Sequence, residues 1–181
     1  SFQYTDGSAI ETDGGNNTIQ DCYFYHIDYT VTDLSSVMTT LKMGGNDNIF
    51  RQNTVHKTGA SSGLNPGNMA LVEYNDMYDT GYLQSDGAII HYMENQQIDS
   101  ETAYNWVHDS PKYGIRFDGD GDGHSGTMHH NVSWDIKSGH MLKGHDHRVL
   151  NNTCFNTSNT GIIVLIDLGG NEGTITRNNA A

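Results

Sequence analysis

A short motif recurs along the whole chain and constrains its fold more than any other feature. In each copy an Asn is followed three residues later by an aromatic residue or His, as in Asn53 with His56. The copies open at Asp21, where Asp replaces Asn, and at Asn53, Asn75, Asn105, Asn131 and Asn152, and Asn178 opens a further one. Successive copies lie 21 to 32 residues apart. Repeats at such spacings build solenoids, and the uneven spacing indicates a constant core interrupted by loops of varying length.

Alternating runs precede most copies of the motif. Each run follows a small residue: Gly87 precedes AIIH, Gly114 precedes IRFD and Gly139 precedes HMLK. Alternation of this kind predicts β-strands that bury one face. The residues expected to face inward are Ala88, Ile90, Ile115, Phe117, Leu142, Ile162 and Val164. Those expected to face outward are Ile89, His91, Arg116, Asp118, Met141 and Lys143.

The recurring Asn residues have a structural explanation. Strands in adjacent coils lie about 4.8 Å apart, so equivalent Asn side chains become neighbours and can form a hydrogen-bonded ladder. We therefore assign these residues no chemistry.

Through the segments NIFRQNTV (48–55) and GHDHRVLNNTC (144–154), the chain resembles the pectin-lyase-like superfamily. The resemblance implies an all-β fold, a right-handed parallel β-helix (solenoid) of about seven coils, forming one domain over residues 1–181. It specifies activity weakly, because such repeats occur in polysaccharide lyases, glycoside hydrolases, epimerases, phage tailspikes and adhesins.

Charge limits the partners that this chain can have. Its 181 residues carry a formal net charge of −13 and include only nine Lys and Arg. We expect neither nucleic acid nor an anionic membrane as a partner, since both require a basic patch. We expect a secreted or cell-surface domain whose export signal lies outside this sequence. Neither end has a segment that would cap a solenoid, so we expect a fragment of a longer solenoid, or ends covered by further coils or another subunit.

A candidate site lies in the outward column of the alternating runs. Alignment of the coils at their inward residues places Lys42, His91, Asp118, Lys143 and Leu165 in equivalent positions. Arg116 lies two residues before Asp118 on the same predicted face. In one interpretation, Arg116 or Lys143 neutralises a uronate carboxylate of an acidic polysaccharide, and Lys143 or His91 removes the adjacent proton. In the other, alternating charges only keep an exposed sheet soluble.

Three aspartates next to this column are candidate calcium ligands. Asp118, Asp120 and Asp122 alternate with glycines, a spacing that resembles the start of an EF-hand loop. A true EF-hand is excluded, because His129 and His130 stand where the closing Glu is needed. The segment is either a calcium site or a flexible acidic turn. In β-helix lyases calcium bridges enzyme and substrate carboxylate, so the resemblance implies that role here.

Histidines concentrate in the second half of the chain. His145 and His147 stand two residues apart and could chelate a transition metal with His124 of the preceding coil. Alternatively, His145, His147 and Trp134 bind substrate together with Lys42, or the histidines are purely structural. His140 is expected to be a satisfied core residue.

Two carboxylates keep a glycoside hydrolase open as an alternative. Asp86 and Asp118 are the pair that could act as acid and base, although both begin ordinary Asp-Gly turns. The preferred hypothesis is a calcium-assisted polysaccharide lyase with His91, Arg116, Lys143 and Asp86 as candidate catalytic residues. A noncatalytic glycan-binding or structural solenoid is the alternative from a different class.

Overall fold

The computed structural model describes residues 1–29, 37–119, 123–159, 163–165 and 170–181. Every regular element in these ranges is a β-strand, as the sequence predicts, and every strand pairing is parallel. The described residues contain no helix that could span a membrane.

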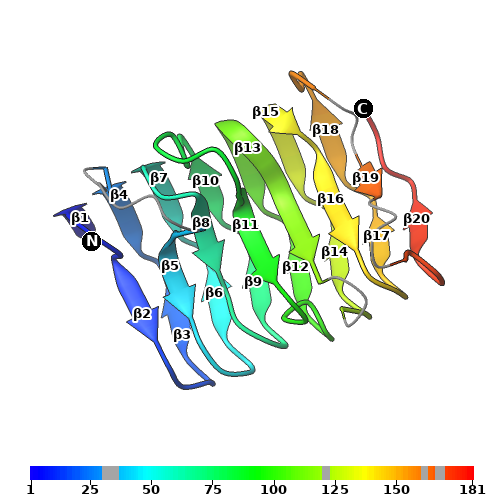
Figure 1. Cartoon of the computed structure of the whole chain (residues 1–181), viewed down its shortest axis with the longest axis horizontal. Coiled ribbons are helices and arrows are strands. Elements are labelled where there is room, and N and C mark those ends of the chain that lie inside the picture. Colours follow the sequence, from blue (N-terminus) through cyan, green and yellow to red (C-terminus); the bar gives the residue numbers. More distant parts are fainter. Residues whose placement is uncertain (30–36, 120–122, 160–162, 166–169) are drawn as a thin grey trace.

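The strands stack in three columns that run along the long axis of the molecule (Figure 1). The first column contains β2 (Ile10–Thr12), β5 (Thr39–Met43), β8 (Ser62–Asn65), β11 (Ala88–Met93), β13 (Trp106–Asp118), β16 (His140–Lys143) and β19 (Ile163–Leu165). The second contains β3 (Thr18–Gln20), β6 (Ile49–Arg51), β9 (Leu71–Glu73), β12 (Glu101–Ala103), β14 (Thr127–His129), β17 (Arg148–Leu150) and β20 (Ile175–Arg177). The third contains β1 (Phe2–Thr5), β4 (Tyr23–Ile27), β7 (Thr54–Thr58), β10 (Asp76–Tyr78), β13 again, β15 (Val132–Ser138) and β18 (Thr153–Phe155).

Strand β13 belongs to two columns because it turns a corner. Its first part pairs with β10 and β15, and its second part pairs with β11 and β16. The register shifts between Ser110 and Tyr113, where the strand bends. The chain thus visits the three columns in turn, an arrangement consistent with a parallel β-solenoid.

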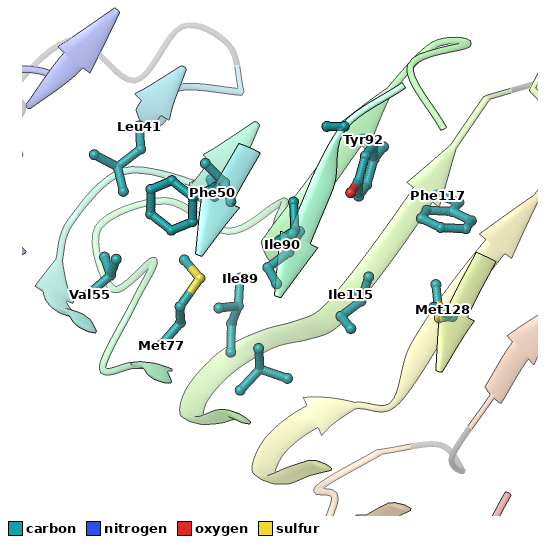
Figure 2. Packing of buried hydrophobic residues seen from close by; sticks show 14 of the residues in the cluster. Leu41, Phe50, Val55, Met77, Ile89, Ile90, Tyr92, Ile115, Phe117 and Met128 are labelled. Carbon is teal, nitrogen blue, oxygen red and sulfur yellow. The ribbon is translucent and has the colours of Figure 1, made fainter. Parts of the chain in front are cut away.

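The core fills the space between the three columns (Figure 2). Ile90 and Phe117 come from the first column, Phe50 from the second, and Val55 and Met77 from the third, and all five are fully buried. Burial of each such side chain contributes roughly 1.5–3 kcal/mol, so every coil contributes to one continuous core.

Three residues expected to face outward are buried: Ile89, His91 and Met141. Ile89 packs in the core, with Gly63 and Gly114 opposite it in the two adjacent strands. Met141, also expected outward, is only 3% exposed. Burial along β11 and β16 therefore does not follow simple alternation.

The predicted Asn ladder is confirmed at the corner between the second and third columns. Side-chain amides donate to the next Oδ1 at 2.8 Å from Asn75 to Asn105 and at 3.0 Å from Asn105 to Asn131. The ladder members are Asn53, Asn75, Asn105, Asn131, Asn152 and Asn179. Each Oδ1 also accepts a backbone N–H of the preceding coil, as between Asn75 and Asn105 at 3.0 Å. The ladder therefore satisfies polar groups that would otherwise be buried without partners.

Both ends of the predicted Asn repeat are wrong by one residue. Cys22, and not Asp21, is in register with Asn53, and Asn179, and not Asn178, continues the ladder. Asp21 and Asn178 instead occupy the position just before the ladder, where the backbone is left-handed with φ of 54° in both. Asp and Asn favour that conformation, which explains why their side chains mislead the alignment.

Candidate functional site

Side chains of the first column and of the loop before β11 form one connected cluster, the charged cluster, made of Asp86, His91, Arg116, Asp118 and Lys143. Arg116 lies at its centre: Nη1 lies 2.6 Å from Oδ1 of Asp86, and Nη2 lies 2.6 Å from Oδ2 of Asp118. The ammonium of Lys143 lies 2.7 Å from Oδ1 of Asp118. All five residues were predicted from the sequence, and the structure brings them together.

The register that joins them differs from the predicted one. His91 lies opposite Arg116, and Asp118 lies opposite Met93 on one side and Lys143 on the other. The prediction paired Asp118 with Lys143 correctly but placed His91 two residues too far along. It also matched Leu165 with Lys143, whereas Leu165 lies opposite Leu142. His91 still reaches Asp118 diagonally across the strands, with Nε2 3.2 Å from Oδ2.

His91 is enclosed and was expected to be exposed. Its side chain is 2% exposed, and Nδ1 lies 2.8 Å from the hydroxyl of Ser62. Burial lowers the pKa of His91, the charge of Arg116 lowers it further, and Asp118 opposes both. The neutral ring donates from Nε2 to Asp118 and accepts the Ser62 proton at Nδ1.

Ser62, His91 and Asp118 thus follow the order hydroxyl, imidazole, carboxylate of a hydrolytic triad. Ser62 is completely buried, so no substrate reaches its oxygen in this arrangement. The chain of hydrogen bonds instead fixes the position of Asp118. The sequence gives no signal for Ser62, which lies in the run SSGLN without clear alternation.

Asp118 is held as an anion. Burial alone would raise its pKa, but hydrogen bonds from His91 and Lys143 and the charge of Arg116 outweigh that effect and lower the pKa well below its usual range. Its side chain is 18% exposed. Two cations and a neutral imidazole therefore surround one ionised carboxylate.

Asp86 approaches the cluster from the loop between β10 and β11. Its side chain is 61% exposed, in contrast to 11% for Arg116. Burial raises the pKa of Asp86 less than the backbone N–H of Gly87 and Arg116 lower it, so the net direction is downward. The loop is anchored by Lys112, whose ammonium donates to the carbonyl oxygens of Gln84 and Asp86.

Lys112 was missed by the sequence analysis. It lies at the corner of β13, where the register shifts, and its aliphatic stem packs over Gly81. Burial lowers its pKa to about 8. No motif marks a corner lysine, so this residue could not be identified from its neighbours in the sequence.

Two predicted substrate-binding residues lie away from the cluster. Lys42 is on β5, where it forms a 2.9 Å ion pair with Glu11 of β2. Trp134 is on β15 in the third column, stacked on His108 with ring centroids 3.9 Å apart. Trp134 belongs to a separate stack of rings formed by Tyr25, His56, Tyr78, His108, Trp134 and Phe155.

The metal hypotheses meet different outcomes. Asp120 and Asp122 lie outside the described residues, whereas both oxygens of Asp118 already contact cations or His91.

His124 and His145 form a parallel bridge near His147. His147 is buried, accepts the Gly126 N–H at Nδ1 and donates from Nε2 to the carbonyl of Lys143 at 2.8 Å, so neither nitrogen is free for a metal or substrate. No group of three or more His, Cys, Asp or Glu within the described ranges is arranged to hold a metal ion.

His140 is buried as predicted, but it is not satisfied. Neither ring nitrogen has a hydrogen-bond partner among the described residues. Burial lowers its pKa to about 4, which keeps the ring neutral.

Comparison of the chain with protein-family models, with curated proteins and with solved structures gives no match. The functional argument therefore depends on the geometry of the side chains.

Proposed function

We propose that the chain is a secreted or cell-surface carbohydrate-active domain that cleaves an acidic polysaccharide by β-elimination. We further propose a right-handed β-helix of about seven coils, related to the pectin-lyase-like superfamily that the sequence resembles. The observation that carries the proposal is the charged cluster, where Arg116 and Lys143 converge on one outward face.

Asp86 supports the proposal because it occupies a position that a substrate carboxylate could take. It contacts Arg116 from the solvent side, at 2.6 Å, while Asp118 holds the other arm of the guanidinium. A uronate carboxylate could replace the exposed Asp86 oxygen with the same geometry. Arg116 would then stabilise the negative charge that develops on the uronate carboxylate when the adjacent carbon loses its proton.

Lys143 is the better candidate for the base, and to act as one it must first release the ammonium proton with which it pairs with Asp118. His91 is enclosed and has both ring nitrogens engaged, whereas the Lys143 side chain is 14% exposed at the edge of the cluster. In this scheme His91 positions Asp118, and Asp118 orients Arg116 and Lys143. The base takes the proton alpha to the carboxylate, and the bond from the next ring carbon to the glycosidic oxygen breaks. A proton from solvent completes the released hydroxyl group, and a double bond remains in the uronate ring.

Calcium has weaker support. The oxygens of Asp118 already face Arg116, Lys143 and His91, so this carboxylate does not fit a further cation. A calcium role would depend on Asp120 and Asp122, and we assign no step of the reaction to it.

Hydrolysis by Asp86 and Asp118 is less favoured. A glycosidase needs one carboxyl group with a raised pKa to act as general acid. Despite burial, the pKa of both groups is lowered: the Gly87 N–H and Arg116 lower that of Asp86, and His91, Lys143 and the charge of Arg116 lower that of Asp118.

A noncatalytic glycan-binding solenoid is the second candidate. It is favoured by the pairing of charges within the cluster, since Arg116 and Lys143 already have carboxylate partners.

The decisive experiment follows the ultraviolet absorbance of unsaturated uronate during incubation with polygalacturonate, alginate and chondroitin, with calcium and with chelator. We expect product from at least one polymer, and a loss of about 100-fold or more in kcat/KM for Arg116→Lys and Lys143→Ala. Arg51→Ala is the matched control, because Arg51 contacts Gln20 and Glu73 in the second column. Circular dichroism would verify that each variant is folded.

Asp86→Asn separates the two reactions. Elimination predicts that activity is retained, with an unchanged or lower KM, because the competing carboxylate is gone. Hydrolysis predicts loss of activity together with an increase in reducing ends without absorbance. Absence of both signals on every polymer would contradict catalysis and favour the noncatalytic solenoid.

A further inference from the structure

A second surface, far from the charged cluster along the coil, has the features of a ligand site. It is a cleft of about 560 Å³ at the corner between the second and third columns. Its principal lining residues are Gln52, Tyr74, Asp76, Tyr104, Trp106 and His130. They come from the ends of β6, β9, β12 and β14 and from β10 and β13, and neighbouring strands among these pair with one another (Figure 1). We call this the aromatic cleft.

Its rings face solvent in an ordered array. Tyr74 and Tyr104 stack with centroids 4.9 Å apart and planes 4° apart, and His130 stacks on Tyr104 at 5.1 Å. Tyr74, Tyr104 and Trp106 are 54%, 41% and 56% exposed. Large aromatic side chains are usually buried when a protein folds. Several exposed ones that line the same cleft therefore indicate a binding surface.

The backbone beneath two of these rings is unfavourable for tyrosine. Tyr74 and Tyr104 have φ of 55° and 57°, in the left-handed region that Asn and Asp adopt more readily. Other coils place Asn151 and Asn178 at the same position before the ladder, with φ of 55° and 54°. The tyrosines thus stand where the fold alone would favour Asn.

The polar groups of the cleft define the ligand. Among the residues that the structure describes, its lining contains the Asp76 carboxylate and the amide of Gln52 but no Lys or Arg. His108 lies 3.0 Å from Asp76 and fixes its position. Such a surface can hydrogen-bond hydroxyl groups and can pack the edges of the stacked rings and the exposed ring of Trp106 against the apolar face of a sugar, whereas the Asp76 carboxylate disfavours a uronate.

We propose that the aromatic cleft binds a neutral saccharide chain that runs across successive coils. Adjacent rings repeat at about the spacing of the strands, so consecutive sugar units meet equivalent rings. This site is separate from the charged cluster and does not depend on lyase activity. It would hold a neutral part of a polysaccharide or cell wall.

The test is titration calorimetry of the intact chain with β-1,4-glucan, β-1,3-glucan and galactan oligosaccharides, and with a uronate oligomer of equal length. We expect binding of at least one neutral oligosaccharide. Tyr104→Asn and Trp106→Thr should each weaken it about fivefold to tenfold. These changes copy residues that other coils carry at equivalent positions, namely Asn151 and Thr54, so folding should be preserved. Tyr82→Ala is the matched control, because this ring is 49% exposed and lies outside the cleft.

Three results would overturn the proposal: no neutral oligosaccharide binds, the uronate oligomer binds more tightly at this cleft, or the cleft variants bind as well as Tyr82→Ala. A dimer in light scattering that Trp106→Thr dissociates would also overturn it, because the rings would then form a protein interface. Failure of the elimination assay leaves this proposal intact, since that assay reports on the charged cluster.

Discussion

The charged cluster and the aromatic cleft use the same solenoid in opposite ways. In the cluster, the polar groups contact one another: Arg116 holds two carboxylates, and Asp118 contacts two cations. In the cleft, by contrast, the side chains of Tyr74 and Trp106 are more than half exposed to solvent. The difference shows that a group of charged side chains is not free to bind a ligand when its members are already paired with one another. A ligand must exchange with existing partners in the cluster, whereas it can add to the cleft.

The largest expected difference between the two regions is in stability. Asp118→Ala leaves Arg116 and Lys143 without the carboxylate between them, so we expect the free energy of unfolding to fall by about 3–5 kcal/mol. Urea unfolding would measure it, with Asp13→Ala, at an exposed carboxylate, as the control. A loss below about 1 kcal/mol would contradict the contrast between the two regions, because the cluster would then stabilise the fold no more than an exposed ion pair does.

A smaller effect should appear with pH. The pKa of Asp118 is lowered in the folded chain by His91, Lys143 and Arg116 despite its burial. Its contribution to stability is therefore complete above the unfolded pKa of about 3.9 and is lost as pH falls toward the folded value. The gap in unfolding free energy between the native chain and Asp118→Asn should be smaller at pH 3 than at pH 7. An equal gap at both pH values would contradict an ionised Asp118.

The smallest expected effect on stability belongs to the cleft. Tyr104→Asn removes an exposed ring and places a residue suited to the left-handed backbone, so we expect a change within about 0.5 kcal/mol of zero. Thermal unfolding of this variant beside Asp118→Ala gives the sharpest contrast between the two regions. A large destabilisation by Tyr104→Asn would indicate that the ring is part of the fold and not of a binding surface.

The sequence predicts the repeating parts of the structure well. Parallel strands, an inward apolar column and the Asn ladder can be predicted because their motifs recur, and each copy of a motif can be aligned with the others. The ladder errors at Asp21 and Asn178 occur where the motif has a neighbour on one side only. A residue that favours a left-handed turn is easily mistaken there for one that favours a ladder.

The candidate site is predictable only in part. Arg116, Asp118 and Lys143 were placed together because Gly114 and Gly139 are equivalent in neighbouring coils. Gly87, however, is not the counterpart of Gly114, because Ile89 lies opposite Gly114. The prediction therefore places His91 two residues too far along. The enclosure of His91 by Ser62 depends on contacts between strands 29 residues apart, which no local pattern encodes.

The strand pairing has a consequence for how such a chain can change in length. In the part of the chain that the structure describes, each strand pairs only with its counterparts in the coils before and after it. Duplication of the gene segment for one coil would therefore add a unit that its neighbours already fit, with the ladder continuing through it. The two sites occupy the middle coils, so the ends of the stack can be extended without disturbing them.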